Sequence, residues 1–434
     1  MSARVRGWFA GEAGLAARVF WVGLTVRLLY MTLAHTYRIR PYEGHFQFAW
    51  EMGRIAKSLG EGRGFADPFA NIFIEHTGPT AWTGPLYPLL IAAVFKVFGI
   101  YTATSAWVVL ALNCVFSAAT AGAVYEIGWR VFGRRVGIWS AWIWALYPAA
   151  MQYAVRWPWE MCLTTLLLMW CVVLTLRMQG VGSREKGVEG GSLRQWALFG
   201  ICWGEIALLN ASLLLFLPVC GIWVLMGTRG KMPAVRGALV AGIIFLALIA
   251  PWAYRNWSVF HAFIPLRGNL GAEMYLGSGP GSEGLLMEYD NPIQDRAQNL
   301  LYARMGEVGY VKMRGEAAKA YIKAEPGHFV GLCWKRVVMF WAGVPREGSW
   351  GSEFGRGLNF GFASLCGLMG LGLALKRRIR GAGLMAWAFL LVPLPYYFIT
   401  VHARFRHPLE PLICVLGVYL FQSAERGGKK AGER

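Results

Sequence analysis

The stretch from Arg40 to Arg54 reads RPYEGHFQFAWEMGR and follows the first long apolar run of the chain. It continues through Glu61, Asp67, Glu75 and His76 to the turn-rich segments TGPTAW (77–82) and GPLYP (84–88). No other part of the chain gathers so many acids, aromatic residues and turn residues between long apolar segments. Because carboxylates at a membrane surface are costly to desolvate, this stretch is predicted to form part of a functional site.

Composition indicates a membrane protein. Of the 434 residues, 56% are hydrophobic and only 15% are charged, whereas ordinary soluble domains carry about 25% charged residues. Apolar runs of about twenty residues recur, and each is long enough to cross the hydrocarbon core as a helix. The sequence therefore predicts an all-α polytopic membrane protein.

The net charge of +19 comes mainly from Lys and Arg in the short gaps between apolar runs. This distribution is typical of cytoplasmic loops, with membrane lipids rather than nucleic acid as the counter-charge. The cysteines lie mostly inside apolar runs and show no metal-binding or redox spacing. We expect them to behave as small buried hydrophobic residues.

About ten spans follow from this pattern. They are predicted at 15–35, 107–128, 137–153, 161–176, 196–209, 212–226, 238–254, 358–375, 384–400 and 405–421. Pro85–Phe98 is short for a crossing, and counting it as a span would move Arg130 and the following basic loops outside. It is therefore predicted to be a juxtamembrane helix in the outer interface, with both termini cytoplasmic.

In this topology three acidic positions reach the outer face. Glu51 falls in a predicted surface helix from His45 to Leu59, and Glu43 precedes it. Glu160 follows Trp-Pro-Trp at the outer mouth of a span. Either acid of the first loop fits a general base, and all three are candidate catalytic residues. The alternatives are a solvated surface acid and, for Glu160, a salt bridge to Arg156.

Basic and aromatic residues at the same face are candidates for substrate binding. Arginines suit phosphate oxygens because their planar guanidinium groups donate in pairs. The candidates are Arg404 and Arg406 before the last span, Arg255, Asn256, Arg267, His76 and Trp82. The alternative for the arginines is anchoring at the membrane interface, and for Trp82 it is a place in the aromatic belt.

The order of motifs resembles a known family. Pro-x-Tyr-Pro (85–88), Arg-x-x-x-Arg-Arg (130–135), the acid at 160, Pro-Trp-x-x-Arg-Asn (251–256) and Arg-Phe-Arg-x-Pro-Leu-Glu-Pro (404–411) follow one another along the chain. This order is similar to that of the C-fold (GT-C) membrane glycosyltransferases. Within that group it resembles the dolichyl-phosphate-mannose–protein mannosyltransferases and the aminoarabinose transferases of families 39 and 83.

The resemblance implies an inverting transferase that uses a polyprenyl-phosphate-linked sugar donor at the exterior face of the cytoplasmic (inner or plasma) membrane. The acceptor would be a lipid, a glycan or a protein, and neither a metal nor a cofactor is required. Family members usually place an Asp after the first span, whereas here Glu43 and Glu51 bracket that position. Glu160 matches the family's second acid, and Arg404 matches a position suited to holding the leaving phosphate.

The expected organisation is a GT-C-like bundle with outer juxtamembrane helices and one larger exterior segment. Residues 1–256 form the transmembrane module with its first exterior loop at 37–103, residues 257–356 form the exterior segment, and residues 357–434 form the last helices and a basic tail. A transporter or flippase of a lipid-linked sugar is the main alternative, and a membrane scaffold is the second. Transporters commonly show inverted repeats and ionisable groups at the midplane, whereas the acids here gather in outer loops.

Overall fold

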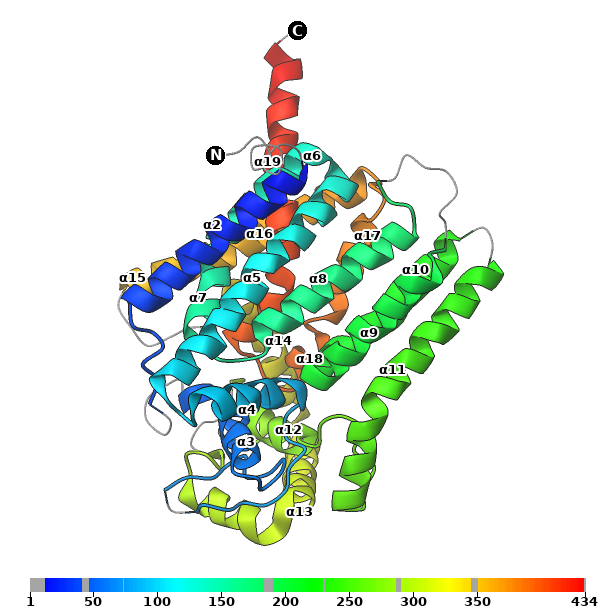
Figure 1. Ribbon diagram of the computed structural model, residues 1–434. Coiled ribbons are helices and arrows are strands. Elements are labelled where there is room, and N and C mark those ends of the chain that lie inside the picture. Colours follow the sequence, from blue (N-terminus) through cyan, green and yellow to red (C-terminus); the bar gives the residue numbers. More distant parts are fainter. Residues whose placement is uncertain are drawn as a thin grey trace.

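The computed structural model describes residues 12–40, 47–72, 74–182, 190–228, 231–285, 290–344 and 350–432. These residues are almost entirely helical (Figure 1). The main helices are α2 (Glu12–Leu33), α3 (Glu51–Gly60), α4 (Leu86–Phe98), α5 (Ala103–Phe132), α6 (Arg134–Leu146), α7 (Pro148–Arg156), α8 (Met161–Met178), α9 (Leu193–Leu209), α10 (Leu217–Gly227), α11 (Lys231–Phe260), α12 (Leu270–Ser278), α13 (Arg296–Ala324), α14 (Pro326–Ala342), α15 (Trp350–Arg356), α16 (Ala363–Lys376), α17 (Ala382–Leu391), α18 (Leu394–Phe398) and α19 (Glu410–Gly432).

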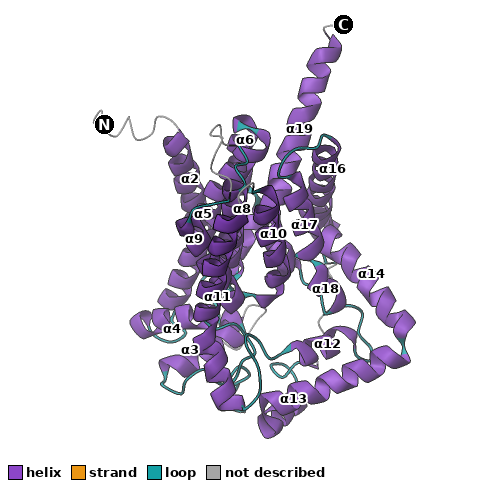
Figure 2. Cartoon of the chain, turned by 90° about the vertical axis from the view of Figure 1, so that its right-hand side faces the viewer, coloured by secondary structure: helices purple, strands orange, loops and turns teal. Residues whose placement is uncertain are grey.

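Long apolar helices form the bundle, which confirms the predicted all-α polytopic class. Among the described residues, five helices are long and apolar enough to cross a membrane: 14–33, 103–132, 161–178, 232–260 and 354–376. Each of the other predicted spans coincides with a shorter helix or a pair of short helices, except 405–421, which covers most of a 3₁₀-helix (Ala403–Leu409) and about the first half of the 23-residue α19. Figures 1 and 2 show these helices running side by side.

A second layer of helices lies across one end of the bundle. Helices α3, α4, α12 and α13 gather there, opposite the start of α2 and the end of α19 (Figures 1 and 2). Helix α4 lies across the ends of the bundle helices, which agrees with the juxtamembrane placement predicted for Pro85–Phe98. We refer to this end as the α3–α4 end.

The span predicted at 137–153 is two helices rather than one. Pro148 has no N–H group, so the carbonyl oxygen of Trp144 loses its helical partner and the chain breaks between α6 and α7. The fully buried Arg27 of α2 donates to the carbonyl oxygens of Trp144 at 3.2 Å and Ala145 at 2.6 Å. An arginine inside the bundle therefore satisfies the carbonyl groups that this break exposes.

Two glycines permit close packing between segments. A Cβ atom at Gly128 of α5 would lie 2.8 Å from the Cα of Gly137 in α6, so these helices touch through small residues. A Cβ atom at Gly84 would lie 2.2 Å from the carbonyl oxygen of Leu208. Gly84 therefore seats the segment before α4 directly on the end of α9.

The α3–α4 end has an aromatic core of its own. Phe69 and Trp82 pack edge-on at 4.8 Å between ring centroids, and Tyr302 of α13 meets Phe69 at 4.7 Å. All three side chains are at most 2% exposed. The segments 37–103 and 257–356 thus share one core, although these residues are more than two hundred positions apart in the sequence.

Candidate active site

Glu51 is placed by an unusual backbone conformation. Phe48, Ala49 and Trp50 have φ angles of 38°, 70° and 53°, a region that residues other than glycine rarely adopt and that is often associated with functional sites. The predicted surface helix therefore begins at Glu51 and not at His45. A Cβ atom at position 53 would lie 1.9 Å from the carbonyl oxygen of Phe48, so Gly53 permits this tight entry.

Glu160 is held by a fixed turn between α7 and α8. The amide group of the buried Asn113 donates to the carbonyl oxygens of Trp157 at 3.0 Å and Trp159 at 3.2 Å. Tyr87 of α4 donates to the same Asn113 at 3.0 Å. Glu160 is 6% exposed, and its Oε2 atom has no hydrogen-bond partner among the described residues.

Arg404 faces this turn from the 3₁₀-helix η5 (Ala403–Leu409), which precedes α19. Its guanidinium carbon lies 3.9 Å from the centre of the Trp159 ring, a stacked arrangement that orients the planar group. Its buried Nε atom has no protein hydrogen-bond partner among the described residues. The arginine therefore retains donor capacity for another acceptor at this position.

Helix α12 adds a third acid. Glu273 accepts a hydrogen bond from Asn269 at 3.0 Å and is partly buried. Arg267, just before this helix, donates from Nε to the carbonyl oxygen of Trp82 at 3.1 Å. The start of α12 is thereby linked to the segment that precedes α4.

These side chains form one electrostatic group, which we call the carboxylate–arginine group. Its members are Glu51, Glu160, Glu273, Arg267 and Arg404. Burial raises the pKa of Glu160, while the positive charges of Arg404 and Arg267 lower it and the negative charge of Glu51 raises it. Burial likewise raises the pKa of Glu273, with the charges of Arg267 and Arg404 opposing and that of Glu51 reinforcing. Charges from four separate segments thus act on Glu160 and Glu273.

The alternative partner of Glu160, Arg156, points elsewhere. Arg156 is exposed and donates to the hydroxyl of Tyr30 at 3.1 Å. Glu43 lies outside the described residues, so the structure compares only Glu51 with the other acids. Among the described residues, no cluster of three or more His, Cys, Asp or Glu side chains has the arrangement of a metal site.

Other candidate residues are not members of this group, and each has structural partners. Arg406 is 1% exposed, pairs with Glu410 at 2.8 Å and donates to the carbonyl oxygens of Trp341 at 2.9 Å and Phe360 at 2.8 Å. It connects η5 to α14 and to the helical turn Gly357–Phe362. Trp82 is 2% exposed in the aromatic core, where it offers its backbone carbonyl to Arg267 and not its ring to solvent.

Arg255 and Asn256 stabilise the end of α11. Arg255 donates to the carbonyl oxygens of Thr80 at 2.6 Å and Phe65 at 2.7 Å, and its guanidinium group lies over the rings of Phe65 and Trp252. Asn256 is fully buried and donates to the carbonyl oxygen of Ile264 at 2.9 Å. Both residues join α11 to neighbouring loops.

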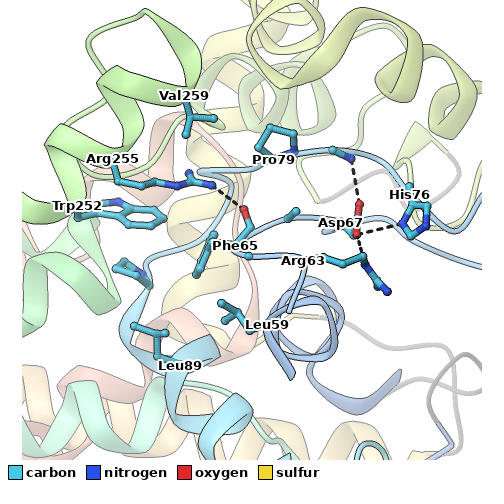
Figure 3. Close-up of a pocket in the computed structure, with 14 residues that line it drawn as sticks. Leu59, Arg63, Phe65, Asp67, His76, Pro79, Leu89, Trp252, Arg255 and Val259 are labelled. Atoms are coloured by element: carbon cyan, nitrogen blue, oxygen red, sulfur yellow. Dashed lines mark hydrogen bonds and ion pairs between the residues drawn. The ribbon is translucent and has the colours of Figure 1, made fainter. Parts of the chain in front are cut away.

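His76 lies at the polar edge of a groove of about 780 Å³ between the segment 59–89 and α11 (Figure 3). Its Nδ1 atom lies 3.5 Å from the Oδ2 atom of Asp67, and the Nε atom of Arg63 contacts the same oxygen at 3.2 Å. The remaining walls are mainly apolar and include Leu59, Phe65, Leu89, Trp252 and Val259. None of the residues that line this groove belongs to the carboxylate–arginine group.

Asp67 is the fixed point of that polar edge. It accepts hydrogen bonds from the backbone N–H groups of Thr77 at 2.8 Å and Gly78 at 3.0 Å. Burial acts to raise the pKa of Asp67, but these two bonds, together with those to His76 and Arg63, outweigh burial and lower it. The carboxylate therefore closes the loop between 67 and 78 as a charged group.

Two acids that were not selected from the sequence prove to be central to this end of the molecule. Glu273 belongs to the carboxylate–arginine group, and the buried Glu307 of α13 binds the loop at 80–81. For Glu273, the only signal in the sequence was its spacing from Asn269 on one helical face. Glu307 had a weaker one, a lone acid placed directly after Gly306 in a helical segment.

Comparison with known proteins identifies the fold. No family model matches the sequence, and no curated protein matches it either. The apo oligosaccharyltransferase of Archaeoglobus fulgidus matches the structure with a TM-score of 0.58 and 14% sequence identity, over 99% of this chain and 53% of that chain.

Two further structures of the Archaeoglobus fulgidus enzyme agree. One, with a tethered acceptor peptide that contains the NVT sequon, has a TM-score of 0.53 and 13% identity over 96% of this chain and 50% of that chain. The other, called AglB and bound to an inhibitory peptide and a dolichol-phosphate, has a TM-score of 0.52 and 13% identity over 95% of this chain and 52% of that chain. The present chain spans about half the length of these proteins and shares their GT-C fold.

Proposed function

We propose that this protein is an inverting membrane glycosyltransferase that moves a sugar from a polyprenyl-phosphate donor to an acceptor hydroxyl group. The observation that carries the proposal is the carboxylate–arginine group. It combines acids suited to proton transfer with guanidinium groups suited to a phosphate, at the end of an apolar bundle. The shared GT-C fold supports the proposal, although a fold alone does not determine the activity.

The residues divide into two roles. Glu51 accepts the proton of the acceptor hydroxyl as its oxygen attacks the anomeric carbon of the sugar. The bond between that carbon and the phosphate oxygen breaks, and its electron pair leaves with polyprenyl phosphate. A single displacement inverts the anomeric configuration.

The arginines stabilise the leaving group. Arg404, with a stacked guanidinium plane and a free Nε donor, binds the phosphate, and Arg267 adds a second positive charge. Preorganised charges of this kind cost no reorganisation during the reaction. The negative charges of Glu160 and Glu273 lie within electrostatic range of both arginines, and we assign them the role of retaining these positive charges at the phosphate.

The isoprenoid tail requires an apolar surface that opens toward the bilayer. We assign it to the groove between the first exterior loop and α11, whose walls are mainly apolar (Figure 3). Leu89 and Val259 at this groove are 47% and 39% exposed, as expected for residues that face lipid. In this proposal the α3–α4 end is exterior, both termini are cytoplasmic, and residues 257–356 form an exterior segment on the transmembrane module.

Release of the lipid product tests the function. The purified protein is incubated with polyprenyl-phosphate sugars and candidate lipid, glycan and protein acceptors, and free polyprenyl phosphate is measured. Acceptor-dependent release that R404A lacks is the expected result. Movement of intact lipid-linked sugar across a liposome bilayer without release would instead indicate a transporter.

A further inference from the structure

Glu307 binds a short segment that lies next to the carboxylate–arginine group. It is 3% exposed and accepts hydrogen bonds from the Thr80 hydroxyl, from the backbone N–H of Ala81 at 2.7 Å and from the Tyr302 hydroxyl at 2.8 Å. A buried carboxylate is unfavourable unless hydrogen bonds compensate for its lost hydration. Three donors converge on this one.

The same segment, residues 80–82, is held from two other directions. Arg255 donates to the carbonyl oxygen of Thr80 at 2.6 Å, and the backbone N–H of Gly268 donates to the carbonyl oxygen of Ala81 at 3.0 Å. The carbonyl oxygen of Trp82 then accepts the bond from Arg267 at 3.1 Å. The segment therefore connects Glu307 to Arg267 through consecutive residues.

The backbone of α13 directs Glu307 toward this segment. Gly306 has a φ angle of 69°, which interrupts the helix immediately before Glu307 and which glycine adopts without a steric penalty. Burial raises the pKa of Glu307, whereas the bonds from Thr80, Ala81 and Tyr302 lower it. The interruption at Gly306 thus lets the carboxylate of Glu307 reach residues 80–81.

We propose that Glu307 is a positioning residue for the transfer reaction, acting through residues 80–82 to hold the guanidinium group of Arg267 at the carbonyl oxygen of Trp82. The inference rests on the proposed function for the role of Arg267 at the phosphate. It assigns to Glu307 no contact with substrate. Its effect passes through the hydrogen bonds to Thr80 and Ala81, so a side chain that keeps those bonds is sufficient.

The test is a double-mutant cycle with a conservative variant. E307A, E307Q, R267A and the double variant E307A/R267A are purified, and E316A serves as a matched control because Glu316 is an exposed acid on the same helix. The dissociation constant for undecaprenyl phosphate and the melting temperature are measured for each. Coupled residues give non-additive effects, and independent residues give additive ones.

We expect E307A to weaken undecaprenyl phosphate binding roughly 10-fold, the change that accompanies loss of about 1.4 kcal/mol. E307Q should stay within about 2-fold of wild type, because its amide oxygen accepts from Ala81 and its amide N–H₂ donates to the oxygen of Thr80 or Tyr302. R267A should weaken binding to a similar degree, and adding E307A should weaken it no further. E316A should bind as wild type.

Three results would overturn the inference: additive losses in the double variant, unchanged binding by E307A, or equal impairment of E307Q and E307A. If the wild-type protein does not bind undecaprenyl phosphate, the proposed function fails. The melting temperatures of the single and double variants then show separately whether Glu307 and Arg267 are coupled. A double variant that loses less than the sum of the two single losses would support the link between Glu307 and Arg267. Additive losses would refute it.

Discussion

Replacing Arg404 tests the assignment of the phosphate site. The guanidinium group stacks at 3.9 Å on Trp159 and keeps a buried Nε without a partner among the described residues. A hydrogen bond to a charged group contributes about 1.5–3 kcal/mol, so R404A should weaken binding of undecaprenyl phosphate by roughly 10- to 150-fold. R404K keeps the charge but loses the planar fork and the stacking, so we expect an intermediate loss.

The assay is titration of the purified protein with undecaprenyl phosphate in detergent, read by native mass spectrometry. R156A is the matched control, because Arg156 is an exposed arginine near the same turn that donates to the Tyr30 hydroxyl. Binding by R156A should equal that of wild type. Wild-type affinity in R404A, or equal losses in R404A and R156A, would show that the phosphate is held elsewhere.

Three other predictions follow from particular contacts. E160Q should reduce turnover roughly 10-fold. Burial raises the pKa of Glu160, so wild type loses stability as pH rises through that pKa. The gain in melting temperature of E160Q over wild type should therefore be larger at pH 8 than at pH 4.5. D67A should cost about 3 kcal/mol of stability. Because the pKa of Asp67 is lowered, the stability difference between D67A and wild type should persist at neutral pH and shrink only below about pH 3.8. Single cysteines in a cysteine-free background should react from outside at 40–80 and 270–350 and from inside at 130–135, and the reverse pattern at 130–135 would mean that α4 spans the membrane.

The bundle was predictable because apolar run length and the distribution of basic residues depend only on local sequence. The short length of Pro85–Phe98 and the arginines after α5 were enough to place α4 across the end of the bundle. The start of α3 was not predictable. It depends on positive φ angles at Phe48, Ala49 and Trp50, residue types whose sequence gives no sign of that conformation.

The site was predictable only in part, because its members meet through the fold. Arg404 and Arg406 are two residues apart and look equivalent in the sequence. In the structure one stacks on Trp159 and the other is buried against Glu410. The i, i+4 spacing of Arg406 and Glu410 was a readable sign of that pairing. Glu273 offered no comparable sign that the charge of Glu51 acts on it, since the two acids belong to helices far apart in the chain.

The most direct test of the central claim separates proton transfer from donor binding at Glu51. Gln keeps the shape of Glu but cannot accept the proton, and general-base catalysis contributes about 10²–10⁴-fold. We expect E51Q to release polyprenyl phosphate at least about 100-fold more slowly than wild type, with unchanged affinity for the polyprenyl-phosphate sugar. E43Q, measured beside it, should be milder. Wild-type release by E51Q with loss of release in E43Q would contradict the choice of Glu51, and wild-type release by both variants would place the base outside the segment 37–103.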